Sequence, residues 1–191
     1  RLPVVQSGTQ PRTPVDPFIL RRLTAEGLAT TLPANRRQLI RRIYFDLLGL
    51  PPPASEVAAF VGDRSPTACE ELIDRLLASP HYGERWGRHW LDVVRYAETN
   101  GYERDAVKPN IWKYRDWVIQ AFNEDMPYDR FVCEQLAGDE LMERTERSVI
   151  ATGMLRAGTW NDEPNDPQDY KFERLEDMVD VVSTAFLGVT V

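Results

Sequence analysis

The sequence predicts an all-α fold, a multi-helix orthogonal bundle of about seven to eight helices with an acidic loop before the last helix. Apolar residues recur at helical spacing, helix start and stop signals separate the segments, and no stretch shows the alternation of a half-buried strand. The 191 residues are 42% hydrophobic, which is a globular composition. We therefore expect residues 1–14 to be a linker and residues 15–191 to form a single helical domain.

The first two predicted helices have recognisable start signals. Asp16 is an N-cap candidate, and Pro17 after it suits the first helical position. Asn35 followed by Gln38 resembles a capping box, in which each residue bonds the backbone of the other. Apolar residues at helical spacing follow, and a glycine and three prolines then predict an abrupt end to the second helix.

Serines mark the next three predicted helices. Residues 55–61 form a short helix, Ser65 begins the next one, and Ser79 begins a fifth helix over residues 80–98. This fifth helix is the most aromatic, and we expect its apolar face to be buried. The face consists of Tyr82, Trp86, Trp90, Val93 and Ala97.

In the second half of the chain, the spacing of apolar residues predicts a loop over residues 99–109 and helices near 111–122, 128–136 and 148–155. An acidic loop with glycine and prolines follows over 157–169. The last helix has an apolar side that we expect to be buried, made by Phe172, Leu175, Met178, Val179, Val182 and Phe186.

The net charge of −7 is unevenly distributed. Residues 1–50 carry eight arginines and three acids, whereas residues 139–180 carry twelve acids and five bases. The acidic half disfavours nucleic acid as a partner. No stretch approaches the roughly 20 apolar residues that a membrane span needs, so we expect no span in this segment.

Both histidines lie in the segment 79–98. His81 and His89 are roughly 80° apart around a helix, so a shared metal needs a ligand from another element. Asp92 follows His89 by three residues and could orient its imidazole, which makes the pair the candidate catalytic residues. The alternative is that Arg88 forms ion pairs with Glu84 and Asp92 while His89 fills a polar niche.

The same helix holds the candidate cofactor-binding residues. Trp86 and Trp90 could stack on a flat cofactor or a sugar ring, and His81 and His89 could ligate iron. Alternatively, tryptophans at helical spacing are simply core residues.

The acidic loop before the last helix is a candidate metal site. Asp162, Glu163, Asp166 and Asp169 supply hard oxygen ligands that suit Ca²⁺. Their spacing does not match an EF-hand, so the alternatives are a solvated loop or one that pairs with the arginine-rich N-terminal helices. The commonest hydrolase, zinc-protease and nucleotide-binding signatures are absent from the sequence.

Several segments together resemble a known family: VDPFILRRL, RRIYFDLLGLPP, HYGERWGRHWLD, MPYDRF with EQLAGD, NDEPND and ERLEDMVDVVSTAFLGVTV. Over about Val15 to Val191, the chain is similar to the planctomycete cytochrome c-associated domain of unknown function. In that family the domain typically follows a small cytochrome c-like domain in large exported proteins. The segment similar to AFLGVTV usually runs into a CxxCH haem-attachment sequence, and this chain ends before that motif.

The resemblance implies an extracytoplasmic (periplasmic) location, haem c in the parent protein, and neighbouring domains, including a cytochrome c-like domain, as partners. His81, His89, Met154 or Met178 could then supply an axial haem ligand. Our leading hypothesis is a helical module of an exported cytochrome c-associated protein that serves electron transfer or positions a haem domain. The alternatives are a metal-dependent or hydrolytic enzyme domain acting on a polymer, and a structural or interaction domain.

Overall fold

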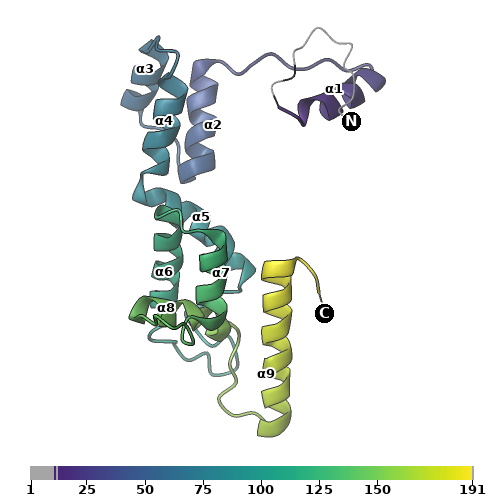
Figure 1. Ribbon diagram of the computed structural model, residues 1–191, viewed down its shortest axis with the longest axis vertical. Coiled ribbons are helices and arrows are strands. Elements are labelled where there is room, and N and C mark those ends of the chain that lie inside the picture. Colours follow the sequence, from purple (N-terminus) through teal and green to yellow (C-terminus); the bar gives the residue numbers. More distant parts are fainter. Residues whose placement is uncertain (1–10, 12, 191) are drawn as a thin grey trace. The chain divides into compact units, whose positions relative to one another are not determined.

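The computed structural model describes residue 11 and residues 13–190, and helices are the regular elements of this part of the chain (Figure 1). In order they are α1 (Asp16–Ala25), α2 (Arg36–Leu48), α3 (Ala54–Gly62), α4 (Ala68–Leu77), α5 (Pro80–Val93), α6 (Trp112–Asn123), α7 (Tyr128–Ala137), α8 (Glu146–Ala151), the 3₁₀ turn η1 (Thr152–Arg156), α9 (Pro167–Val182) and the π-helical turn η2 (Ser183–Leu187). The described residues contain no strand, and an isolated bridge joins Thr99 to Val107. The all-α prediction is confirmed.

Among the described helices, none is both long enough and apolar enough to cross a membrane.

The chain divides into two compact units, one up to Leu39 and one from Ile40 onward. The single domain over 15–191 stays a prediction.

In the first unit, the Asp16 carboxylate accepts a 2.8 Å bond from the Thr13 amide. The Asn35 and Gln38 capping box is confirmed: the Gln38 amide donates to Asn35 Oδ1 at 2.9 Å and the Asn35 amide donates to Gln38 Oε1 at 3.0 Å.

In the second unit, α2 ends where Gly49 adopts a φ of 72°, a left-handed conformation that favours glycine. The three prolines that follow prevent continuation of the helix. Next in the chain, α3 and α4 are joined by an ion pair of Arg75 with Glu56 at 2.5 Å. Local start and stop signals therefore position these helices much as the sequence predicts.

The contact of α5 with α6 depends on two glycines. Gly83 and Gly87 are buried, and a Cβ on Gly83 would lie 2.3 Å from the Ile119 carbonyl oxygen. Asn123 at the end of α6 accepts a bond from the Gly83 amide at 2.8 Å and donates to the Pro80 carbonyl at 3.1 Å. The absence of side chains at the two glycines lets the two backbones approach closely.

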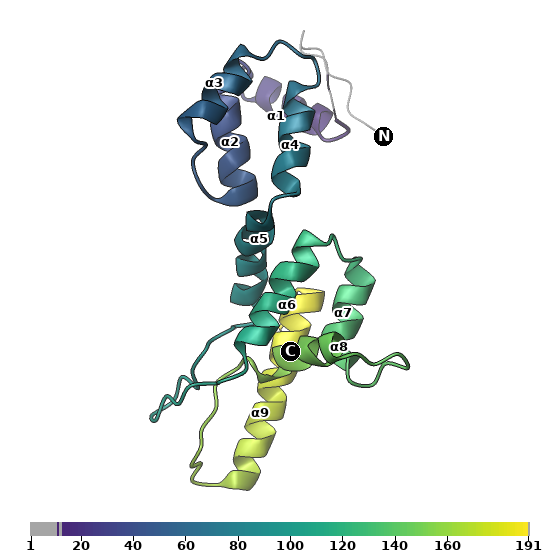
Figure 2. The same ribbon diagram turned by 90° about the vertical axis from the view of Figure 1, so that its left-hand side faces the viewer.

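The core of the second unit surrounds α6. Its buried face is formed by Tyr114, Trp117, Val118 and Ala121. Val94, Ile111, Phe131 on α7, Ala151 on α8 and Met154 on η1 complete the cluster. Figure 2 shows α6 and α7 next to each other, with α8 running across their ends.

The last helix, α9, packs against this core mainly through its C-terminal end. Val181 and Val182 at the end of α9, with Ala185 and Phe186 of the following turn η2, are partly buried against the core cluster. The ring of Phe186 lies 5.4 Å from that of Trp90. No residue of α9 itself is fully buried.

Candidate functional site

The two histidines of α5 lie on the protein surface. Ser79 caps the helix by accepting a bond from the His81 amide at 3.4 Å. The His81 ring contacts Glu84, with 2.8 Å between Nδ1 and Oε2, and both side chains are more than half exposed. An exposed imidazole can reach an external ligand.

The predicted pair of His89 and Asp92 does not form a hydrogen bond in this structure. Both side chains are exposed, and the His89 ring instead lies edge-on to Trp86 at a centroid distance of 5.4 Å. The Asp92 carboxylate therefore does not orient the imidazole here. The ion pairs expected for Arg88 with Glu84 and Asp92 do not form either, and Glu84 is instead paired with His81.

The prediction of a buried aromatic face on α5 is wrong in part. Trp86 is 37% exposed and Val93 is 45% exposed, whereas the buried residues of the helix are Gly83 and Gly87. Since the close approach to α6 leaves no room for rings at the contact, Trp86 lies beside it. Trp90 is the tryptophan of this helix that packs against the core.

Trp90 belongs to a polar network inside the core that the sequence does not reveal. Its indole Nε1 donates to Gln135 Oε1 at 2.8 Å and to Tyr114 Oη at 3.1 Å. The Tyr114 hydroxyl in turn donates to the same Gln135 oxygen at 2.7 Å. Burial raises the pKa of Tyr114, so the phenol stays neutral. With its single N–H donor shared between Gln135 and Tyr114, Trp90 acts as a structural residue in this network.

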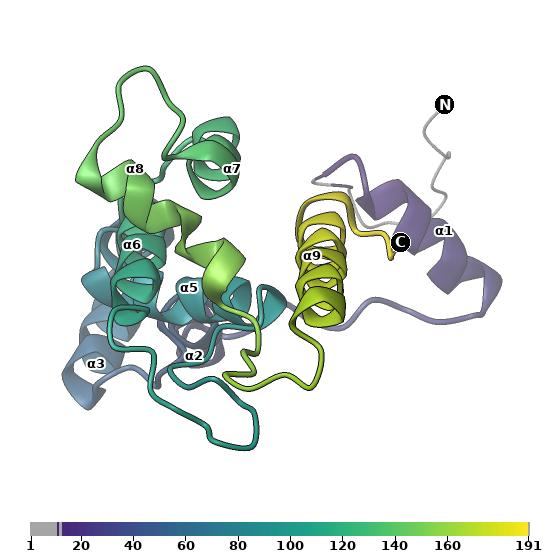
Figure 3. The same cartoon turned by 90° about the horizontal axis from the view of Figure 1, so that it is seen from below.

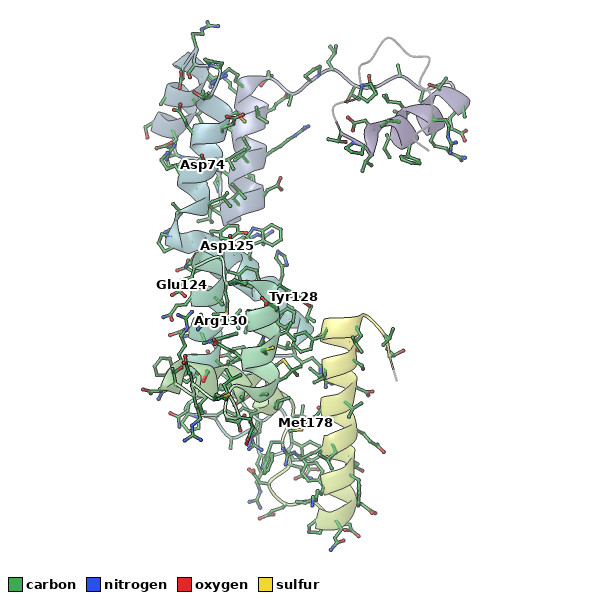
Figure 4. All side chains as sticks on the ribbon, in the orientation of Figure 1. Asp74, Glu124, Asp125, Tyr128, Arg130 and Met178 are labelled. Carbon is green, nitrogen blue, oxygen red and sulfur yellow. The ribbon has the colours of Figure 1, made fainter. Side chains whose placement is uncertain are left out.

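A second buried polar group lies next to the first. Glu134 is 2% exposed, and its carboxylate accepts a bond from Trp117 Nε1 at 3.3 Å and from Arg130 Nε at 2.7 Å. Arg130 reaches it from the solvent-facing side of α7 (Figure 4). In the sequence, the two adjacent polar residues Glu134 and Gln135 interrupt an otherwise apolar helix face. This interruption could have indicated buried polar contacts.

The acidic loop does not bring its four carboxylates together as a ligand set. Asp166 caps α9, accepting a bond from the Gln168 amide at 2.8 Å, and Glu163 pairs with Arg104 at 2.5 Å. Asp162 and Asp169 are exposed. Across the described part of the chain, no group of three or more His, Cys, Asp or Glu side chains could hold a metal ion. Each carboxylate thus has a separate position in the loop.

The outer side of α9 is an exposed apolar surface of the second unit, and it corrects the predicted buried stripe. Phe172 is 63% exposed, Leu175 49% and Val179 55%. At about 100° per residue, the three lie within roughly 60° of one another. We call these three residues the α9 apolar face. In Figure 3, which looks along α9, the other helices of the second unit lie to one side of it.

Acidic residues border the α9 apolar face along one edge. Glu173, Glu176 and Asp180 follow it around the helix within roughly the next 120°. On the opposite side, Met178 is half-buried (Figure 4), and Asp177 is bound to Arg95 at 2.6 Å. The helix therefore presents an apolar strip with a negative border, which is the arrangement of a protein-binding surface.

Comparison with known proteins gives one match. A family described as PSCyt2, protein of unknown function (DUF1549), matches residues 14–191. Searches of curated proteins and of solved structures found no match. Since the match extends over most of the sequence, this chain belongs to the PSCyt2 family of proteins of unknown function.

Proposed function

We propose that this chain is a positioning module of an exported, extracytoplasmic protein, and that it holds a haem-bearing neighbouring domain against the α9 apolar face. The observation that carries the proposal is the uncovered strip of Phe172, Leu175 and Val179, with acids along one edge. Large apolar side chains arranged on one face of a helix gain free energy when a partner covers them. The resemblance to cytochrome c-associated domains suggests haem c as the cofactor of the partner.

The size of the surface favours a partner in the same polypeptide. A stable interface between separate proteins buries about 800 Å² on each side, which is more than three side chains on one helix offer. A covalently linked neighbour needs much less contact area, because its effective concentration is in the millimolar range. The acidic border further predicts that the partner has Lys or Arg beside its apolar patch.

The positions of the candidate haem ligands favour positioning over haem binding within this chain. Met154 is 2% exposed, so its sulfur cannot reach an external haem while the core stays folded. His81 and His89 are exposed and Met178 is half-buried, so these three remain the candidates that can approach iron on a neighbouring domain. A bridging role for either histidine would add electron transfer to the positioning role.

The proposal is tested on the parent protein, produced with c-type haem maturation. Visible spectroscopy should show covalently bound haem, and small-angle X-ray scattering should show a compact arrangement of the domains. The double variant Leu175→Ser/Val179→Ser should keep its haem and become more extended. The control is Val93→Ser on α5, which removes a side chain that is 45% exposed outside the α9 apolar face.

Each part of the proposal can fail separately. A parent protein without covalent haem would remove the haem partner, and calcium found in its place would favour the acidic loop as a metal site. Scattering curves that do not change in the double variant would remove the docking role of α9.

A further inference from the structure

A cleft of about 660 Å³ opens between the loop before α6, the α8–η1 segment and the end of the loop that carries Trp160. Its apolar wall includes Ile111, Tyr114, Ile150 and the Trp160 indole. The volume is that of a small-molecule site, and the combination of aromatic wall and polar rim is typical of such sites. Neither the α9 apolar face nor the histidines of α5 line it.

The rim of the cleft is strongly basic although the chain as a whole is acidic. Lys108, Lys113 and Arg156 line the cleft, and none of the three forms an ion pair with a carboxylate among the described residues. Asp162 is the acid that lines the cleft within that part of the chain. The rim therefore carries three cations and one acid, which is an excess of positive charge.

The fold holds two of these cations in place. Lys108 Nζ donates to the carbonyls of Ala157 at 2.9 Å and Gly158 at 2.6 Å, which leaves one of the three ammonium donors for a ligand. Arg156 lies over the Trp160 ring with its guanidinium carbon 4.3 Å from the ring centroid. A stacked guanidinium keeps its N–H groups at its edge, where they can bind a carboxylate or phosphate in bidentate geometry.

A second arginine adds to the positive field. Arg174 also lies over the Trp160 ring, with its guanidinium carbon 4.1 Å from the ring centroid. Desolvation and the charge of Arg156 lower the pKa of Lys108, and the same two causes lower the pKa of Arg174. A bound anion would reduce the repulsion between these cations. Because the fold already holds them in place, an anion can bind without rearranging them.

We propose that this cleft is a binding site for a small organic anion, one whose carboxylate or phosphate groups contact Lys108, Lys113 and Arg156 while its apolar body lies against Ile111, Ile150 and the edge of the Trp160 ring. The apolar wall distinguishes such a ligand from a bare inorganic ion. The site is independent of the haem-positioning role and does not use the α9 apolar face.

The test uses two probes that share an aromatic body, phthalate for carboxylates and phenyl phosphate for phosphate. Binding to the chain is measured by calorimetry and by the NMR shift of the Trp160 indole N–H, assigned with a Trp160→Phe variant. At least one probe should bind with a Kd in the millimolar range or tighter, more weakly as salt is raised. The preferred probe identifies the anionic group.

Charge-removing variants locate the site. Arg156→Gln combined with Lys113→Gln should weaken binding at least tenfold and leave the NMR spectrum of the fold intact. Arg22→Gln is the control for loss of positive charge outside the cleft: it removes one charge, from an exposed pair with Glu26 on α1, whereas the double variant removes two from the cleft. Absence of binding by both probes, or an equal loss in Arg22→Gln, would overturn the proposal.

Discussion

Tyr114 links three helices through a single hydroxyl group. It donates to Gln135 on α7, accepts from Trp90 on α5, and is itself 1% exposed on α6. Each of these bonds crosses between helices, so the network fixes their relative orientation as well as satisfying buried polar groups.

Tyr114→Phe should lower the free energy of unfolding by about 0.5–1.5 kcal/mol, since Gln135 keeps its bond from Trp90. The variant should also change the pH dependence. The folded protein holds Tyr114 neutral at pH values at which the unfolded chain releases the proton, so wild-type stability falls above pH ~10. Urea unfolding between pH 8 and pH 11 should show a shallower fall for Tyr114→Phe.

Some alkaline sensitivity should survive in that variant. Burial, followed by the charge of Glu98, raises the pKa of Tyr96 to about 12, and this group titrates in the same direction. Identical slopes for wild type and Tyr114→Phe would contradict the importance of the buried phenol.

The tryptophans should differ in their contribution to stability. Trp117 is 3% exposed, so Trp117→Ala should lower the free energy of unfolding by about 3–5 kcal/mol. Trp86 is 37% exposed, and Trp86→Ala should lower it by only about 1 kcal/mol. Guanidinium unfolding of both variants measures the difference, and equal losses would mean that α5 is rotated relative to this structure.

What the sequence predicts at single residues depends on how far apart the partners lie in the chain. The capping pair of Asn35 and Gln38 is predictable because the two residues are three apart and the helix geometry dictates their contact. Trp90 and Gln135 are 45 residues apart, and only the packed fold brings them together. No local rule gives that contact.

Among the helices, the contact of α5 with α6 tolerates little added volume. Gly83→Ala should lower the free energy of unfolding by about 1–3 kcal/mol, because its Cβ would lie 2.3 Å from the Ile119 carbonyl oxygen. The control is Gly62→Ala in α3, whose Cβ would meet nothing within 4 Å. That control should be neutral or stabilising by up to about 1 kcal/mol in thermal unfolding. A destabilised control with an unchanged Gly83→Ala would contradict the proposed packing.

The prediction for α9 was half correct, for a general reason. Its amphipathic pattern identifies a helix with an apolar side, but periodicity does not say whether that side is covered within this chain or by another one. The structure covers Val182 and Phe186 and leaves Phe172, Leu175 and Val179 exposed. The amphipathic pattern therefore predicted the helix correctly but predicted the burial of Phe172, Leu175 and Val179 wrongly.

Substitutions on the exposed side of α9 should change the free energy of unfolding less than substitutions on the side that packs against the core. Leu175→Ser should change the free energy of unfolding by no more than about 0.5 kcal/mol, because the side chain is 49% exposed. Val181→Ser, on the side that packs against the core, should lower it by more than about 1 kcal/mol. Urea titrations compare the two, and a large loss for Leu175→Ser would show that its side chain contributes to folding.

Across the whole molecule, the sequence predicts the helical class and the approximate order of the helices, and both are confirmed. It does not predict the buried face of α5, because two glycines rather than its aromatic residues make the closest contact with α6. It also places His89 and Asp92 three residues apart without fixing their side chains, which do not bond each other. A binding surface depends on which side chains the fold leaves exposed, so the α9 apolar face could be identified only from the structure.

The docking role of α9 is the central claim, and side-chain footprinting of the parent protein tests it most directly. Hydroxyl-radical modification of Phe172 and Leu175 is compared between this chain alone and the parent protein, with Tyr128, which is 62% exposed on α7, as the internal reference. We predict that Phe172 and Leu175 are modified several-fold more slowly in the parent protein while Tyr128 is unchanged. Equal modification of the α9 apolar face in both proteins would contradict the claim.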